Sequence, residues 1–316
     1  MVQDRGGSRS AGDEPRRYRL TLSPSTRSRE LCSTVTATAP IPGLLQETEW
    51  KRRAEYIPFF FTIHPPLDAH RHARLELFYS DLKGDSPVKL SVVVPVFNEC
   101  ASLQAILEQV RSAPVAPMEL EIVAVDDCST DGSREILKSE AQRGDLKVIF
   151  HEVNQGKGAS VRTGLRAVTG DIVLIQDADL EYDPADYPIL LKPILAGKTK
   201  VVYGSRFLGE HKAMYFWHSL GNRFLTLVTN VLFDTTLTDM ETCYKVFTSE
   251  VAACIELKSP RWGFDPEITA RILRHGFRIY EVPISYAGRE YQEGKKITWK
   301  DGLVVLFTLL RYRFLS

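Results

Sequence analysis

Two aspartates separated by one residue follow an apolar run in the middle of the chain. Residues 171–179 read Asp-Ile-Val-Leu-Ile-Gln-Asp-Ala-Asp, so Asp177 and Asp179 come directly after a stretch typical of a buried strand. Side chains two apart on an extended chain point to the same side. Carboxylate oxygens are the hard ligands that Mg²⁺ and Mn²⁺ prefer, and these cations usually also hold substrate phosphates. The pair predicts a divalent-cation site, although a solvated turn or a helix cap also accounts for such a short motif.

Further polar segments follow apolar runs earlier in the chain. They are Pro95-Val96-Phe97-Asn98-Glu99, then Asp126-Asp127 with the turn residues 129–133, and then Asn154-Gln155-Gly156-Lys157-Gly158. Glycines and a lysine at a helix start let backbone N–H groups approach an anion. The first strand is followed by neither Gly-x-Gly-x-x-Gly nor a P-loop spacing. The pattern therefore excludes both a dinucleotide-binding fingerprint and a Walker motif at that position.

Alternating strands and helices must position these groups. Residues 90–96 are a continuous β-branched run typical of a parallel strand, and a helix opening at Asn98-Glu99 places apolar residues on one face. Strands at 120–125 and 147–151, helices at 134–141 and from 158 through 168, and a fourth strand before Asp177 continue the alternation. This order predicts an α/β fold with a doubly wound, mostly parallel sheet. Such sheets bind ligands at the carboxyl ends of their strands.

The second half of the chain offers more candidate side chains. A short strand at 201–203 leads to Arg206, whose guanidinium can grip a phosphate with two hydrogen bonds. Asn222 and Arg223 lie in an expected helix at about 215–233. Asp239 is either a general base or a helix N-cap. Glu267 is similarly ambiguous, since Pro266 beside it fits a first helical turn.

Composition restricts the class of protein. The 316 residues are 44% hydrophobic, enough for one large α/β domain or two small ones with an ample core. Lys plus Arg and Asp plus Glu balance at 40 each, so the chain lacks the overall positive charge that favours nucleic-acid binding. The 5 cysteines are odd in number and show no Cys-x-x-Cys pair, which argues against a disulfide framework and a zinc site. A reducing, cytoplasmic location fits best.

Three segments are expected. Residues 1–85 form an N-terminal extension that is largely disordered, because its first 45 residues are rich in Ser, Thr, Arg and Pro without apolar periodicity. The amino terminus does not fit a secretory signal. Residues 86–297 form the catalytic domain. No apolar run reaches the roughly 18 to 20 residues that a membrane span needs.

Residues 298–316 form an amphipathic helix. Trp299, Leu303, Leu306, Phe307 and Leu310 recur at helical spacing, and Lys295, Lys296, Lys300, Arg311 and Arg313 bracket them. Apolar and aromatic residues flanked by cations are typical of a helix in a membrane interface. A terminal helix packed on the sheet is the alternative.

The ordered motifs resemble those of family 2 inverting glycosyltransferases, and within that family the dolichyl- or polyprenyl-phosphate mannose synthases. The resemblance covers residues 88–316 and rests on the segments at 95–99, 125–133 and 154–158, on Asp177-Ala178-Asp179 and on Gly204-Ser205-Arg206. Two residues depart from it. Cys128 stands where the family often has Gly, and Glu181 stands where the mannose synthases often have Gln.

The resemblance implies a GT-A-like nucleotide-diphospho-sugar transferase fold and assigns roles to residues. It implies that Mg²⁺ or Mn²⁺ binds to Asp177, Asp179 and Glu181. The nucleoside pocket would be bordered by Pro95, Asn98 and Glu99, with Asp127 reaching the nucleobase and with Gly156 and Lys157 beside the ribose and diphosphate. Asp179, Arg206 and Asp239 would have catalytic roles, and Asn222 and Arg223 would contact the lipid phosphate. Two alternatives stay open. Asp126 and Asp127 can simply cap the Ser129 turn, and Glu99 can be a first-turn helix acid.

The resemblance further implies inverting transfer of a hexose, mannose from GDP-mannose, to a polyprenyl or dolichyl phosphate at the cytosolic face of a membrane. Such an acceptor is already anionic and can attack without a general base. Two alternatives remain: a family 2 transferase with a polysaccharide or protein acceptor, and a non-catalytic sugar-nucleotide-binding, membrane-associated protein. No residue pattern separates GDP-mannose from UDP-glucose as donor.

Overall fold

The computed structural model describes residues 87–259, 261, 263–289 and 299–315. The expected disordered extension at 1–85 lies outside the described residues, as do Lys295 and Lys296. The boundaries proposed for the three segments therefore stay predictions.

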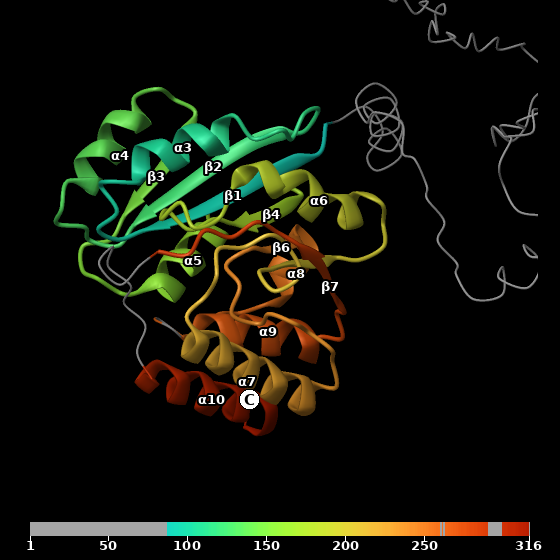
Figure 1. Ribbon diagram of the computed structural model, residues 1–316. Coiled ribbons are helices and arrows are strands. Elements are labelled where there is room, and N and C mark those ends of the chain that lie inside the picture. The colour runs from blue at the N-terminus through green and yellow to red at the C-terminus, as the bar shows by residue number, and fades with distance from the viewer. Residues whose placement is uncertain (1–86, 260, 262, 290–298, 316) are drawn as a thin grey trace, which may run out of the picture. The chain divides into compact units, whose positions relative to one another are not determined.

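One seven-stranded sheet, in the order β3-β2-β1-β4-β6-β5-β7, organises the described chain (Figure 1). The strands are β1 (Lys89–Val96), β2 (Glu119–Asp126), β3 (Leu146–Phe150), β4 (Ile172–Ile175), β5 (Val201–Ser205), β6 (Lys245–Thr248) and β7 (Ile279–Pro283). The first four strands pair parallel with one another, as predicted. β6 is antiparallel to both β4 and β5, and β7 pairs parallel with β5. The sheet is thus mixed, and its antiparallel strand was not predicted.

Helices cover both faces of the sheet (Figure 1). With the numbering of the figure, they are α3 (Leu103–Arg111), α4 (Ser133–Ala141), α5 (Lys157–Leu165), α6 (Tyr187–Leu195), α7 (Phe216–Phe233), α8 (Ser249–Cys254), α9 (Phe264–Arg274) and α10 (Trp299–Phe314). α3, α4 and α6 lie on one face, and α5 and α9 lie on the other, with α7 and α10 stacked beyond α9. Before α6, residues Pro184–Asp186 form a single 3₁₀ turn.

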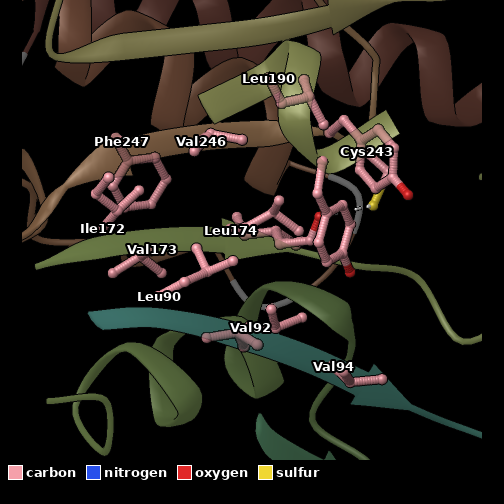
Figure 2. Packing of buried hydrophobic residues seen from close by; sticks show 14 of the residues in the cluster. Leu90, Val92, Val94, Ile172, Val173, Leu174, Leu190, Cys243, Val246 and Phe247 are labelled. Carbon is pink, nitrogen blue, oxygen red and sulfur yellow. Dashed lines mark hydrogen bonds between the residues drawn. The ribbon is translucent and has the colours of Figure 1, made fainter. Parts of the chain in front are cut away.

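The core is built from the apolar strands that the sequence indicated. Side chains of β1, β4 and β6 lie side by side on one face of the sheet, as Figure 2 shows for Val92, Leu174 and Val246, all of them inaccessible to solvent. α5 approaches β1 closely at Gly164, where an added Cβ would lie 2.4 Å from a Val93 methyl carbon. Glycine permits this approach, so the last turn of α5 packs directly on β1.

Element boundaries follow the sequence prediction closely, with one informative exception. The four apolar residues expected on one face of α3, namely Leu103, Ile106, Leu107 and Val110, are all buried. The helix begins at Leu103, however, and not at Asn98-Glu99. Residues 97–102 instead form a turn in which Asn98 has a positive φ of 54°, leaving its side chain available to the neighbouring loop.

One buried carboxylate joins α9 to α10 and to the segment before α9. Glu267 on α9 accepts hydrogen bonds from the Lys258 and Ser259 backbone N–H groups (2.8 and 2.6 Å), from Arg271 Nε (2.8 Å) and from the Tyr312 hydroxyl on α10 (2.7 Å). The expected first helical turn at Pro266 is present. The sequence left Glu267 ambiguous; in the structure it joins α9 to α10.

None of the helices in the described part of the chain combines the length and the apolar character needed to cross a membrane. The four cysteines in that part are free thiols.

Candidate active site

Asp177 and Asp179 lie directly after β4, at its carboxyl end, as predicted. Lys157, the first residue of α5, reaches Asp177 and contacts both of its carboxylate oxygens at 2.7 and 2.8 Å. The structure therefore joins the glycine-lysine loop to the aspartate pair, 20 residues apart in the sequence.

Asp179 occupies an environment that disfavours its charge. Burial, followed by the neighbouring carboxylates of Asp177 and Glu181, raises the pKa of Asp179 to about 7, against the opposing effect of Arg289. A divalent cation between the two aspartates would relieve this repulsion, and their oxygens are the ligands that Mg²⁺ and Mn²⁺ favour. Both the donor atoms and the charge at this place fit such a cation.

The structure does not bring Glu181 to the two aspartates as a third ligand. Its Oε2 accepts from the Tyr286 hydroxyl at 2.9 Å, and its Oε1 accepts from the Arg289 backbone N–H at 2.8 Å. No group of three or more His, Cys, Asp or Glu side chains suited to a metal forms within the described ranges. Glu181 instead fixes the end of β7 beside the loop that follows β4.

Arg289 was not singled out from the sequence, yet it spans the candidate site. Its Nε donates to the Asp179 carbonyl oxygen at 3.1 Å, and its other two nitrogens contact Glu99 at 2.6 and 3.3 Å. Ser102 adds a second link, since its hydroxyl donates to the Ala178 carbonyl oxygen at 2.7 Å and lies 3.1 Å from Glu99 Oε2. Glu99 is thus an ion-pair partner of Arg289, not an acid inside the first turn of α3.

Asp127 holds the glycine-lysine loop. Its buried carboxylate accepts from the backbone N–H groups of Gln155 (2.9 Å) and Gly156 (2.6 Å) and contacts His151 Nδ1 at 2.8 Å. Gly156 needs a φ of 92°, which glycine tolerates. The simple turn-capping alternative for Asp127 does not hold, because Asp126 receives the Ser129 N–H. The expected contact of Asp127 with a base stays a prediction.

The loops after β1 and β2 are joined at the same edge. Asn98 N–H donates to the Ser129 hydroxyl (3.0 Å), and Asn98 Oδ1 accepts from Thr130 N–H (2.9 Å). Cys128 in that loop has a φ of 62°, in the left-handed region that favours glycine. Pro95 lies at the end of β1, paired with Val125. The residues expected around a nucleoside thus lie on adjoining strand ends.

Arg206 and Asp239 form a buried ion pair. Arg206 Nε and a terminal nitrogen each lie 2.7 Å from separate oxygens of Asp239, and the Arg206 backbone N–H donates to the same carboxylate at 3.1 Å. Although burial by itself would lower it, Asp239 holds the pKa of Arg206 well above its usual range. No helix starts at Asp239, since the next element is β6, so the N-cap alternative does not hold. Catalytic roles for the two residues stay predictions.

Asn222 and Arg223 lie on α7. The Arg223 guanidinium stacks 5.1 Å from the ring centre of Phe207, the residue after Arg206. Nearby, a cavity of about 230 Å³ is lined by Lys212 and Tyr215 from the segment before α7 and by Tyr286 and Arg289 from the segment after β7. The cavity therefore borders Arg289, which contacts the aspartate loop.

The fold is similar to that of a solved enzyme. The structure resembles glucosyl-3-phosphoglycerate synthase from Mycobacterium tuberculosis in complex with Mn²⁺, uridine diphosphate and glucosyl-3-phosphoglycerate, with a TM-score of 0.59 and 19% identity over 81% of this chain and 88% of that chain. The same enzyme is also solved with Mg²⁺ and uridine diphosphate, at a TM-score of 0.58. The architecture is thus a GT-A-like fold, the class that the motifs implied.

Residues 91–255 match the model of Glycosyl transferase family 2. The chain belongs to this family and is a glycosyltransferase.

Three relatives show the range of the similarity. An uncharacterized protein of Methanocaldococcus jannaschii is 30% identical over 70% of this chain and 91% of its own length. A dolichyl-phosphate beta-glucosyltransferase of Trichomonas vaginalis is 30% identical over 63% of this chain and 66% of its own length. An undecaprenyl-phosphate mannosyltransferase of Micrococcus luteus is 28% identical over 66% of this chain and 87% of its own length. Named relatives thus act on polyprenyl phosphates with different sugars.

Proposed function

We propose that the protein transfers a hexose, mannose from GDP-mannose, to a polyprenyl or dolichyl phosphate, with inversion at the anomeric carbon. The observation that carries this proposal is the group at the end of β4, where Asp177 contacts Lys157 of the loop that Asp127 holds and Asp179 lies two residues further on. Two carboxylates and a lysine at a helix start suit a cation-bound diphosphate. The similarity to two polyprenyl-phosphate transferases supports the acceptor class.

Asp177 and Asp179 are the proposed ligands of Mg²⁺ or Mn²⁺. Such a cation supplies charge neutralisation for a leaving diphosphate. Lys157 is placed to share that neutralisation, and it opens α5, whose N-terminus favours a nearby anion. Asn98, Glu99 and Pro95 border the proposed nucleoside pocket.

In the proposed reaction, a phosphate oxygen of the acceptor attacks the anomeric carbon from the face opposite the diphosphate. The new bond joins sugar and lipid phosphate, the bond to the diphosphate breaks, and nucleoside diphosphate leaves. An acceptor phosphate is already ionised, so no proton needs to be removed. Asp239 then serves to hold Arg206 toward the acceptor side, since both Asp239 oxygens contact its guanidinium.

The cavity lined by Lys212 and Arg289 is the proposed place of the acceptor phosphate. Its two cations offer charge-assisted hydrogen bonds to a phosphate, and Arg289 is next to the aspartate loop. Residues of α10 are proposed to contact the membrane that holds the acceptor, at its cytosolic face.

A donor screen with polyprenyl phosphate and Mn²⁺ tests this function. GDP-[¹⁴C]mannose and UDP-[¹⁴C]glucose are supplied separately, and label is measured in the organic and aqueous phases. We expect label in the organic phase for one donor, and no transfer by Asp179→Ala, because one of two proposed cation ligands is lost. Full turnover by Asp179→Ala would contradict the metal site, and label retained in an aqueous polymer would indicate a polysaccharide or protein acceptor instead.

A further inference from the structure

Two neighbouring helices expose apolar stripes to solvent. On α7 the stripe comprises Trp217, Leu220, Phe224, Leu227 and Val231, which are 46% to 77% exposed. Their spacing of three, four, three and four residues places them on one side of the helix. On α10 the stripe comprises Leu303, Phe307, Leu310 and Phe314, which are 40% to 70% exposed and similarly spaced. We call these nine residues the docking face.

The docking face is separate from the contacts that hold the two helices in the protein. α7 and α10 meet through Leu225, Val228, Val305 and Leu309, packed around Met240. Each helix is therefore apolar on two sides, of which only one is used internally. Folded proteins rarely leave so many large apolar side chains exposed together, and those that do usually bind something there.

The charges beside the docking face are positive. α7 contains Arg223 and no Asp or Glu, and the part of α10 whose side chains the structure describes, residues 302–314, contains Arg311 and Arg313 and no Asp or Glu. Arg223, Arg311 and Arg313 are exposed. Two copies of such a face would bring like charges together, which opposes self-association. A surface with negative headgroups above an apolar layer matches both the charge and the apolar stripes.

The docking face begins at the cavity proposed for the acceptor phosphate. Tyr215, which lines that cavity, immediately precedes α7, and exposed Phe216 and Trp217 follow it. A lipid whose phosphate lies in the cavity would leave its chain next to these aromatic side chains. Aromatic residues favour the boundary between headgroups and acyl chains.

We propose that the docking face lies in the interface of a bilayer containing anionic phospholipids, with α7 and α10 both in contact with it. The inference rests on the proposed function in so far as the acceptor resides in that membrane. The sequence predicted membrane contact for residues 298–316 alone. The proposal adds α7, which carries Trp217 at the start of the docking face. The docking face would thereby present the Lys212–Arg289 cavity to lipid headgroups.

Binding of the full chain to vesicles tests the proposal. Vesicles of phosphatidylcholine with phosphatidylserine are sedimented with wild type, with the double variant Leu227→Asp and Val231→Asp, and with Ile189→Asp. Ile189 is an exposed apolar residue of α6, on the other face of the sheet, and is the matched control. We expect the double variant to lose about tenfold or more in bound fraction, because two aliphatic side chains leave the contact, and Ile189→Asp to bind as wild type does.

A fluorescence measurement gives the position of α7 directly. Phospholipids brominated on their acyl chains should quench Trp217 in the bound protein, and the quenched component should vanish in Trp217→Phe. Equal vesicle binding by the double variant, or no binding by wild type, would overturn the proposal. A concentration-dependent dimer that the same double variant abolishes would also overturn it and assign the face to a second copy.

The proposal and the proposed function fail in different ways. The double variant should keep its rate on a short-chain polyprenyl phosphate dispersed in detergent, since no substituted residue lies at the candidate active site. Vesicle binding without any transfer would refute the proposed function and leave the docking face supported.

Discussion

Lys157 is paired with the carboxylate of Asp177, one of the two ligands proposed for the cation. Its ammonium contacts both oxygens of Asp177, and although burial by itself would lower it, Asp177 holds the pKa of Lys157 well above its usual range. The lysine therefore stays charged and competes with a metal ion. A bound diphosphate would draw the lysine away from Asp177 and open the site, so cation and donor should bind better together than alone.

Lys157→Met should strengthen Mn²⁺ binding in the absence of nucleotide. We expect about a tenfold gain, the size of one partly buried ion pair, together with weaker binding of the nucleotide. Titration calorimetry with MnCl₂ alone measures the effect, and Lys157→Arg, which keeps the charge, is the control. Identical Mn²⁺ affinity in the methionine variant and wild type would show that the lysine does not compete.

Glu241 should make stability depend on pH. Burial, followed by the nearby Asp265 carboxylate, raises the pKa of Glu241 to about 8, and its Oε1 has no hydrogen-bond partner among the described residues. Between the ordinary pKa of a glutamate and pH 8, the folded protein keeps this proton while the unfolded chain loses it. The free energy of unfolding therefore falls as pH rises through that window.

Glu241→Gln, which cannot ionise, should flatten this part of the pH dependence and stabilise the protein at pH 8 relative to wild type. A one-proton difference gives a slope of at most about 1.4 kcal/mol per pH unit. Urea unfolding of both proteins at several pH values between about 5 and 8 measures the difference. Parallel curves would mean that Glu241 is ionised in the folded state.

Single residues also show what the sequence could predict. Asp177 and Asp179 were found because both their type and their spacing after an apolar run are local features. Arg289 and Tyr286 were missed because their contacts join them to residues more than a hundred positions away. Cys128 departs from the glycine common in the family, and its left-handed backbone explains why glycine is the easier choice there.

At the scale of elements, α10 depends on α9 through Glu267. The carboxylate accepts four hydrogen bonds, and Tyr312 donates one of them from α10. Tyr312→Phe should cost about 1 kcal/mol, one hydrogen bond among four, whereas Glu267→Gln should cost about 2–3 kcal/mol because a charged acceptor is lost and an amide N–H₂ then faces buried donors.

Chemical unfolding followed by circular dichroism ranks these two variants. Hydrogen exchange should show faster exchange in α10 for both, and the larger loss for Glu267→Gln. An equal cost for the two substitutions would mean that the contact with Tyr312 alone accounts for the role of Glu267.

The elements were predictable to different degrees. The first four strands are apolar runs bounded by turn residues, so composition alone located them. β6 is four residues long, and its antiparallel direction depends on where the preceding segment crosses the sheet, which local sequence does not encode. α7 was predicted as a helix, but its exposed stripe has the same spacing as a core-facing one, so only the packing of α10 shows which side is free.

At the scale of the whole molecule, catalysis on vesicles should depend on salt. Cations beside the docking face interact with anionic headgroups through solvent, where the Debye length shortens as ionic strength rises. Raising NaCl from about 0.05 to about 0.5 M should lower the vesicle-bound fraction several-fold. The rate with a short-chain acceptor in detergent should change little, and this pair of assays separates docking from chemistry. An equal loss in both would place the salt effect at the active site.

The Ser102 hydroxyl links the proposed donor pocket to the proposed cation site. One hydroxyl contacts Glu99, which borders the proposed nucleoside pocket, and the Ala178 carbonyl oxygen between the two aspartates proposed to bind the cation. A shift of either loop should therefore move the other. If a bound nucleoside changes the affinity for the cation, the cation must change the affinity for the nucleoside by the same factor. Ser102→Ala should let the two loops move independently. The affinity for the nucleoside should then depend little on the cation, and the affinity for the cation little on the nucleoside.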